Sequence, residues 1–126
     1  MSTTGETPSD MSAAFAARMN AGDLDGLVGL LAPDAVSRTP AGEILTDPTQ
    51  IRADLAGLLA RRPHLVNALR HTLISGDVAL EIIDWTLELD APDGRARLAG
   101  TTANVVRRDE HGAWRLAVLN PTGTAG

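Results

Sequence analysis

The sequence predicts one α+β domain in which helices come first and an antiparallel sheet follows. Apolar residues recur at helical spacing between residues 11 and 61. From residue 64 onward the pattern changes to long strand-like runs separated by short turns rich in Gly and Asp. The chain has 126 residues, of which 44% are hydrophobic and 21% charged, and this composition is typical of a single folded domain.

Three helices are expected in the first half of the chain, after a flexible segment over residues 1–9. The first covers residues 11–20, the second begins at Leu24 and is ended by Pro33, and the third covers residues 48–61. Each is preceded by an aspartate that can cap it, namely Asp10, Asp23 and Asp47. Their apolar stripes indicate packing on one side against a sheet.

Strands account for most of the remainder. A short hairpin is expected from Ala35–Thr39 and Ile44-Leu45, which flank a Pro-Ala-Gly-Glu turn. Four longer strands then follow over residues 64–75, 78–90, 95–108 and 113–120. Because their connections are short, consecutive strands are expected to pair as an antiparallel meander. The domain is therefore expected to cover residues 10–124.

Several classes of function are excluded by composition. The chain has no cysteine, so it has no thiolate metal ligand and no cysteine nucleophile. All 11 basic residues are arginine, which excludes lysine Schiff-base chemistry. A net charge of −5 and only three aromatic residues (Phe 1, Trp 2, Tyr 0) argue against a nucleic-acid partner. No apolar run has the length of a membrane span, so a cytoplasmic protein is expected.

The three histidines give no metal-ligand spacing, and no cofactor motif is present, so we expect neither a metal nor a cofactor. The strand registers then indicate where a pocket could lie. A two-residue turn at Gly76-Asp77 and a four-residue turn at residues 109–112 place a mixed set of side chains on one face. That face is expected to carry Asn67, Leu69, His71, Leu73, Leu80, Ile82, Asp84, Thr86, Gly100, Thr102, Asn104, Ala117 and Leu119.

A mainly apolar face with a few polar groups near its centre is typical of a small-molecule pocket. Asp84 is the expected catalytic acid/base, because burial among apolar neighbours would raise the pKa of its carboxyl group. His71 is expected diagonally across the hairpin, where it could assist. Both residues could instead only stabilise the sheet through hydrogen bonds. Expected substrate-binding residues are Asn67, Leu69, Thr102, Asn104 and Leu119.

The opposite sheet face is expected to be too apolar to contact water. It would carry Glu81, Ile83, Trp85, Leu87, Thr101, Ala103, Val105, Trp114, Leu116 and Val118. A second apolar face on an antiparallel sheet predicts a partner subunit, most simply in a two-fold homodimer.

Several segments together resemble a known family. They read Asn-Ala-Gly-Asp-Leu-Asp-Gly-Leu at 20–27, Leu-Ala-Pro-Asp-Ala-Val at 31–36, Gly-Arg at 94–95, Arg-Arg at 107–108, His-Gly-Ala-Trp-Arg at 111–115 and Asn-Pro at 120–121. In this order they resemble the SnoaL-like branch of the nuclear-transport-factor-two-like superfamily, which includes ketosteroid isomerases, polyketide cyclases and epoxide hydrolases. The resemblance implies a cone-shaped, curved sheet around a deep pocket, commonly in a dimer.

Two departures from the family pattern affect the expected chemistry. Relatives usually have Asp-Asn-Pro where this chain has Leu119-Asn120-Pro121, and Asn104 stands where relatives often have Asp. The resemblance implies a cofactor-free isomerase, cyclase or epoxide-opening hydrolase acting on an apolar, oxygenated small molecule. The alternative is a binding or accessory module that has lost its catalytic acid. A third interpretation is a structural protein whose pocket is filled by Leu69, Leu80 and Leu119.

Overall fold

Local signals set where the helices begin in the computed structural model, which describes residues 7–124. Helix α1 spans Asp10–Asn20, α2 spans Leu24–Val28 and α3 spans Pro48–Leu59. The Asp23 carboxylate accepts a hydrogen bond from the Gly26 N–H, and the Asp47 carboxylate accepts one from the Thr49 N–H. These two aspartates are therefore N-caps, as the sequence predicted, whereas Asp10 is the first residue of α1 and Ser9 takes the N-cap position. Most of the expected flexible segment lies outside the described residues.

Six strands form one sheet with the order β2-β1-β6-β5-β4-β3. The strands are β1 (Leu31–Arg38), β2 (Ile44–Leu45), β3 (His64–Ser75), β4 (Val78–Ala91), β5 (Gly94–Arg108) and β6 (Trp114–Leu119). Their bounds lie close to the expected ones, except that β1 begins before Pro33, so that α2 is shorter than predicted. Most pairings are antiparallel, but β1 and β6 are parallel.

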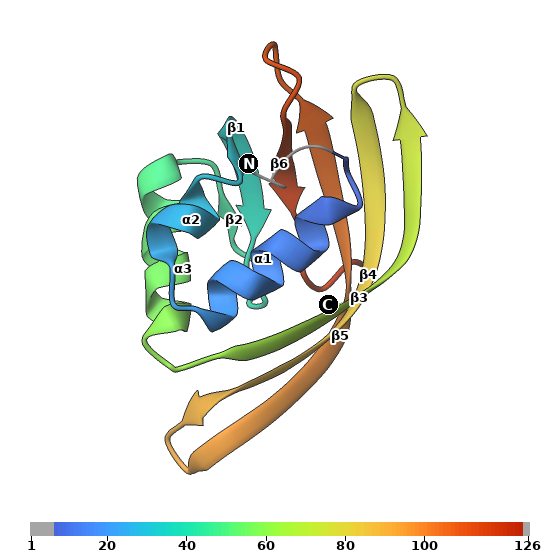
Figure 1. Cartoon of the computed structure of the whole chain (residues 1–126). Coiled ribbons are helices and arrows are strands. Elements are labelled where there is room, and N and C mark those ends of the chain that lie inside the picture. Colours follow the sequence, from blue (N-terminus) through green and yellow to red (C-terminus); the bar gives the residue numbers. More distant parts are fainter. Residues whose placement is uncertain (1–6, 125–126) are drawn as a thin grey trace.

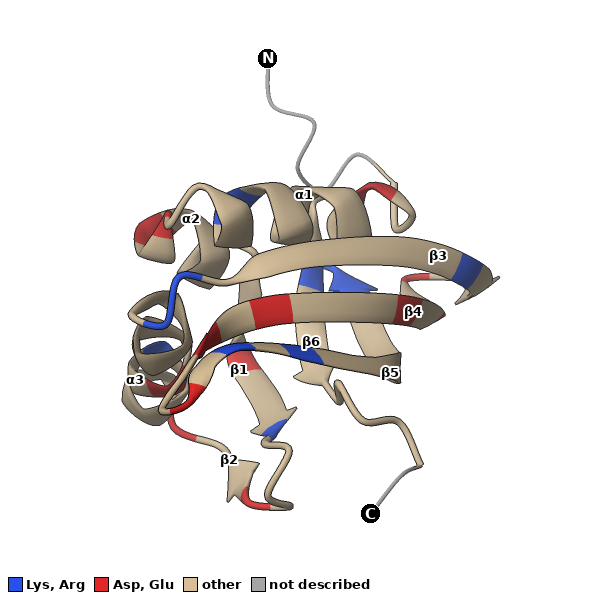
Figure 2. Ribbon diagram, turned by 90° about the horizontal axis from the view of Figure 1, so that it is seen from below, with Lys and Arg blue, Asp and Glu red and all other residues tan. Residues whose placement is uncertain are grey.

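The sheet is strongly curved and encloses the helices on its concave side (Figure 1). Helix α1 crosses this side next to β3, while α2 and α3 lie beyond the end of α1. Seen from below, α1 runs alongside β3, and α3 lies near the ends of the long strands where β4 and β5 are joined (Figure 2). The fold is therefore the expected α+β cone. Among the described residues, no helix is long and apolar enough to cross a membrane.

Two groups of buried apolar residues hold the helices on the sheet. One joins Met11 of α1 to Val106, Trp114 and Leu116. The other joins Met19 to residues of α2, α3 and β1, including Leu27 and Leu55. Both groups thus join the helices to the concave side of the sheet.

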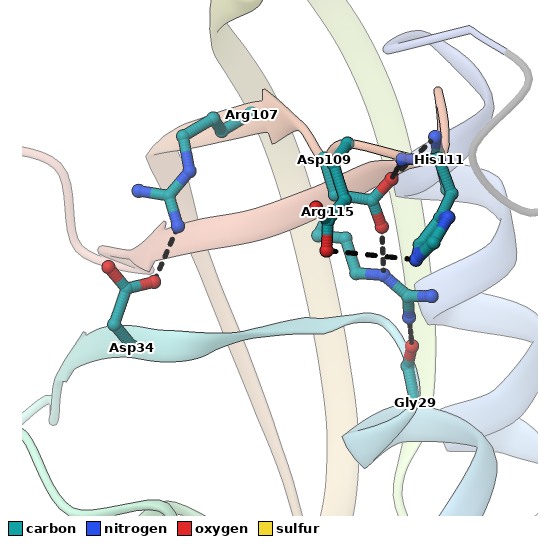
Figure 3. A network of polar contacts seen from close by, with 8 residues as sticks. Gly29, Asp34, Arg107, Asp109, His111 and Arg115 are labelled. Carbon is teal, nitrogen blue, oxygen red and sulfur yellow. Dashed lines mark hydrogen bonds and ion pairs between the residues drawn. The ribbon is translucent and has the colours of Figure 1, made fainter.

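The loop between β5 and β6 is tied to the chain that enters β1 (Figure 3). Asp109 accepts hydrogen bonds from the backbone N–H groups of His111 and Ala113 and forms an ion pair with Arg115. Arg115 in turn donates to the backbone carbonyl of Gly29. These contacts lower the pKa of the Asp109 carboxyl group, first through the Ala113 N–H. The network therefore holds the β5–β6 loop against the segment between α2 and β1.

Candidate functional site

A cavity of about 730 Å³ lies between the concave face of the sheet and the helices. Its helical wall includes Phe15 and Leu58, and its sheet wall includes inward-facing residues of β3, β4 and β5. A volume of this size is within the usual range of about 300–1,000 Å³ for small-molecule pockets. The lining side chains are mostly apolar. The interpretation in which Leu69, Leu80 and Leu119 fill the pocket is therefore wrong.

The predicted register between β4 and β5 is also wrong, by one residue. Ala91 pairs with Gly94 across a two-residue turn, so Ile83 lies opposite Thr102 and Asp84 lies opposite Thr101. Because alternate residues of a strand point to opposite faces, this shift exchanges the two faces of β4. The residues of β4 that line the cavity are Glu81, Ile83, Trp85, Leu87 and Leu89.

Asp84 consequently lies on the convex face, outside the cavity. Its carboxylate forms a two-pronged ion pair with Arg70 and accepts a hydrogen bond from the Thr101 hydroxyl at 2.8 Å. The Thr101 hydroxyl, followed by Arg70, lowers the pKa of Asp84 below its ordinary value. The opposite direction was predicted from the sequence, on the premise that Asp84 is buried among apolar neighbours.

A bulge in β3 moves His71 away from its expected position, and Leu69 lies outside the cavity although it precedes the bulge. The register against β4 shifts between Leu69 and His71, at Arg70. His71 pairs with Ile82 and is exposed on the convex face, together with Asp84. Leu69 pairs with Ile83 but is 36% exposed and does not line the cavity. Leu69, His71 and Asp84 therefore all lie outside the pocket.

The other four predicted residues do line the cavity: Asn67, Thr102, Asn104 and Leu119. Asn67 donates from Nδ2 to the backbone carbonyl of Ser12, and the Thr102 hydroxyl donates to that of Pro121. These two side chains therefore also attach α1 and the C-terminal segment to the sheet.

The side-chain amide of Asn104 uses its oxygen in a hydrogen bond and leaves its nitrogen available. Its Oδ1 accepts a hydrogen bond from the Asn120 N–H at 2.8 Å. Within the described part of the chain, its Nδ2 group donates no hydrogen bond. Asn104 lies directly opposite Glu81 in the β4–β5 register. An amide donor and a carboxyl group therefore stand side by side at the cavity wall.

Glu81 is the residue that the sequence analysis placed on the wrong face. It is 0% exposed, lines the cavity, and neither of its carboxyl oxygens has a hydrogen-bond partner among the described residues. Burial raises the pKa of Glu81 to about 7. One signal could have found it: Glu81 shares its strand face with Ile83, Trp85, Leu87 and Leu89, the most apolar alternating set in the chain.

The indole ring of Trp85 forms a fixed part of the wall. Its Nε1–H donates to the backbone carbonyl of Pro121 at 2.8 Å. Gly100 lies opposite Trp85 on β5, and a Cβ atom at Gly100 would be 2.7 Å from the ring atom Cζ2. Only glycine therefore leaves the ring in its place, so that Gly100 and Pro121 together determine the shape of the cavity.

Charged groups occur near the opposite side of the cavity, where α3 and the end of β1 line it. Arg38 donates to the side chains of Asn120 and Thr122, and thereby holds the C-terminal segment. Burial, followed by repulsion from Glu43, raises the pKa of Asp54. The cavity thus has one buried carboxyl group at Glu81 and a charged, partly exposed region elsewhere.

The Glu81 carboxyl group is suited to proton transfer. The residues that the structure describes contain no group of three His, Asp or Glu side chains that could hold a metal ion. A carboxyl group with a pKa near 7 can both accept and release a proton at neutral pH. The Nδ2 group of Asn104 can hydrogen-bond an oxygen atom of a bound molecule.

Comparisons with known proteins agree with this architecture. No curated protein is significantly similar to the sequence. A ketosteroid isomerase-like protein from Erwinia carotovora atroseptica has a TM-score of 0.79 at 13% identity, with 94% of each chain covered. A superfamily member from Salmonella enterica serovar Typhimurium, described as nuclear transport factor 2-like, has a TM-score of 0.78 at 16% identity, with 93% of this chain and 88% of that chain covered.

A third structure, from Streptomyces avermitilis, carries a provisional dehydratase description within the NTF2-like family. It has a TM-score of 0.77 at 18% identity, and 94% of each chain is covered. Likenesses at such low identity show the fold alone. The family model described as the SnoaL-like domain matches residues 12–116, which is more than half of the chain. The chain therefore belongs to the SnoaL-like domain family.

Proposed function

We propose that the protein catalyses a cofactor-free proton transfer on an apolar, oxygenated small molecule, with Glu81 as the general acid/base. The observation that carries the proposal is the Glu81 carboxyl group, which lies at the wall of an apolar cavity without a protein partner. A charged or polar group is costly to bury, so an unpaired buried carboxyl group is a good candidate for a functional one. The reaction would be an isomerisation, a cyclisation or an epoxide opening.

Neighbouring side chains would bind the oxygen atoms of the substrate. Asn104 is the best placed, because its Nδ2 group lies beside Glu81 and donates no other hydrogen bond in the described part of the chain. Asn67 and Thr102 would contribute polar contacts, and Leu119 an apolar one. Asp84 and His71 have no part in this proposal, because both lie on the convex face.

The test follows the proton directly. Purified protein would be incubated in deuterated water with cyclic ketones such as 2-decalone, and exchange of the hydrogens next to the carbonyl would be measured by NMR. Epoxides would be tested by incorporation of ¹⁸O from labelled water. We expect Glu81→Gln to lower the rate by about 10²–10⁴-fold, the range for removal of a general acid/base. The matched control, Asp84→Asn, should keep the wild-type rate.

Retention of the rate in Glu81→Gln would refute the proposal. The alternative function, a binding or accessory module, is favoured by Leu119, which lines the cavity where relatives have an acid. It predicts that a ketone or epoxide raises the melting temperature of the wild type and of Glu81→Gln equally, without exchange or ¹⁸O incorporation.

We also propose that the protein forms a homodimer through its convex sheet face. The β4 residues expected on that face, among them Ile83 and Trp85, line the cavity instead, so other residues would form the interface. A row of apolar residues crosses five strands in register there: Leu73, Leu80, Val105, Val118 and Val36. Leu73, at the β3 end of this row, is 61% exposed, as an apolar residue of an unfilled interface would be. Light scattering should show a dimer for the wild type and a monomer for Leu80→Glu. Ala13→Glu, on the exposed side of α1, is the matched control, and an unchanged mass for Leu80→Glu would refute this interface.

A further inference from the structure

Three buried side-chain oxygens in the described chain have no hydrogen-bond partner, and all three lie at one place. They are Oε1 and Oε2 of Glu81 and Oγ1 of Thr72. Thr72 pairs directly with Glu81 in the β3–β4 register. Residues opposite each other on antiparallel strands have Cβ atoms about 5 Å apart. The three orphaned oxygens are therefore neighbours across one strand pair.

The bulge at Arg70 creates this pairing. Before the bulge, Leu65 and Asn67 point to the concave side, and after it Thr72 takes that side, while His71 is left outside. A regular β3 would place His71 on the concave side instead, as the sequence analysis assumed. The irregular strand thus presents a small hydroxyl group to Glu81. β-Bulges commonly re-aim side chains in this way near functional sites.

We infer that Thr72 and Glu81 form a subsite for one neutral hydroxylic oxygen, either of a water molecule or of an alcohol group of the ligand, and that Thr72 thereby positions Glu81. This inference rests on the proposed role of Glu81. The two side chains do not hydrogen-bond to each other, so one oxygen atom between them would satisfy both. Buried polar groups in folded proteins nearly always have such a partner.

The subsite lies beside the cavity and not within it. Glu81 lines the cavity, whereas Thr72 does not. A carboxyl group has two oxygens, so one could be held at the subsite while the other serves the proposed proton transfer. The bound oxygen would also restrict rotation of the Glu81 side chain. Such restriction would hold the second carboxyl oxygen in one position, which is the form of positioning that catalysis requires.

The pKa of Glu81 is a suitable readout for the subsite, because no charged side chain among the described residues contributes to its shift. Burial is the single cause of the raised pKa of Glu81, and no charged group on the elements packed around it contributes. A hydrogen bond from the subsite would favour the ionised form of the carboxyl group. Loss of the subsite should therefore raise the pKa of Glu81 further.

The test compares Thr72→Val, which replaces the hydroxyl by a methyl group of similar size, with Thr72→Ser, which keeps the hydroxyl. The Glu81 carboxyl band would be titrated by infrared difference spectroscopy, with Glu81→Gln as the reference that identifies the band. For Thr72→Val we expect a midpoint about one pH unit higher and a C=O band at higher frequency. Thr72→Ser should restore both to the wild-type values.

Two arms identify the source of the oxygen. A difference between Thr72→Val and the wild type without any ligand assigns the subsite to water, and a difference that occurs only with cyclohexanol assigns it to a ligand alcohol. Identical spectra in both conditions would refute the subsite, and a higher melting temperature for Thr72→Val would then identify Thr72 as an unsatisfied hydroxyl. If Thr72→Val does not fold, Thr72→Ala serves in its place. The titration needs no turnover, so its result is independent of the proposed catalysis.

Discussion

Replacement of Glu81 by glutamine should change how the stability of the protein depends on pH. Burial raises the pKa of Glu81 from 4.5 to about 7. Below about pH 4.5 the residue is protonated in the folded and unfolded chain alike, and it causes no penalty. Between these two values only the unfolded chain releases the proton, so the free energy of unfolding falls as the pH rises. Above about pH 7 the penalty is constant.

The size of the penalty follows from the same two values. Each pH unit between them corresponds to about 1.4 kcal/mol, so the full penalty is about 3 kcal/mol. Most of it develops between about pH 5 and about pH 8.5, where we expect a loss of about 2–3 kcal/mol in the wild type. Glutamine has the same shape and no charge, so Glu81→Gln should not show this loss.

The assay is urea unfolding followed by tryptophan fluorescence, at about pH 5 and about pH 8.5. The quantity compared is the change in unfolding free energy between the two pH values, because constant effects of the amide group then cancel. Asp84→Asn is the matched control: its lowered pKa leaves it ionised in this range, so its pH dependence should equal that of the wild type. Parallel curves for the wild type and Glu81→Gln would show that Glu81 is not a buried, unpaired acid.

Three further substitutions test how the cavity and helices are built. Gly100→Ala should lower ligand affinity and cost about 1–3 kcal/mol by urea unfolding, because its methyl group displaces the indole ring of Trp85. Asn20→Ala should cost about 1–3 kcal/mol, because Asn20 bonds both the N–H and the carbonyl of Leu65 at 2.7 and 2.8 Å. Asp47→Ala, which removes a cap, should lower the unfolding free energy by about 1 kcal/mol. Wild-type values for any of these variants would contradict the corresponding contact.

Much of the fold was predictable from local sequence. Capping aspartates, Pro48 and the change from helical to alternating spacing identified the helices and the long strands. The resemblance then gave the family, and with it the curvature of the sheet. Asn67, Thr102 and Asn104 were also placed on the correct face. Such signals depend only on residues close in the chain, which is why the sequence alone is sufficient for them.

Tertiary structure decided which acid faces the cavity. The side chains of a strand alternate between two faces, so a shift of one residue reverses the face of each side chain. The shift at the turn before β5 brings Glu81 to the cavity in place of Asp84, and the extra residue at Arg70 brings Thr72 to the concave side in place of His71. The bulge has no distinctive signature in this sequence, whereas Pro92-Asp93-Gly94 fits the two-residue turn that the structure shows. Burial of the apolar set that includes Trp85 and Leu89 favours the observed face of β4 and outweighs the cost of also burying Glu81.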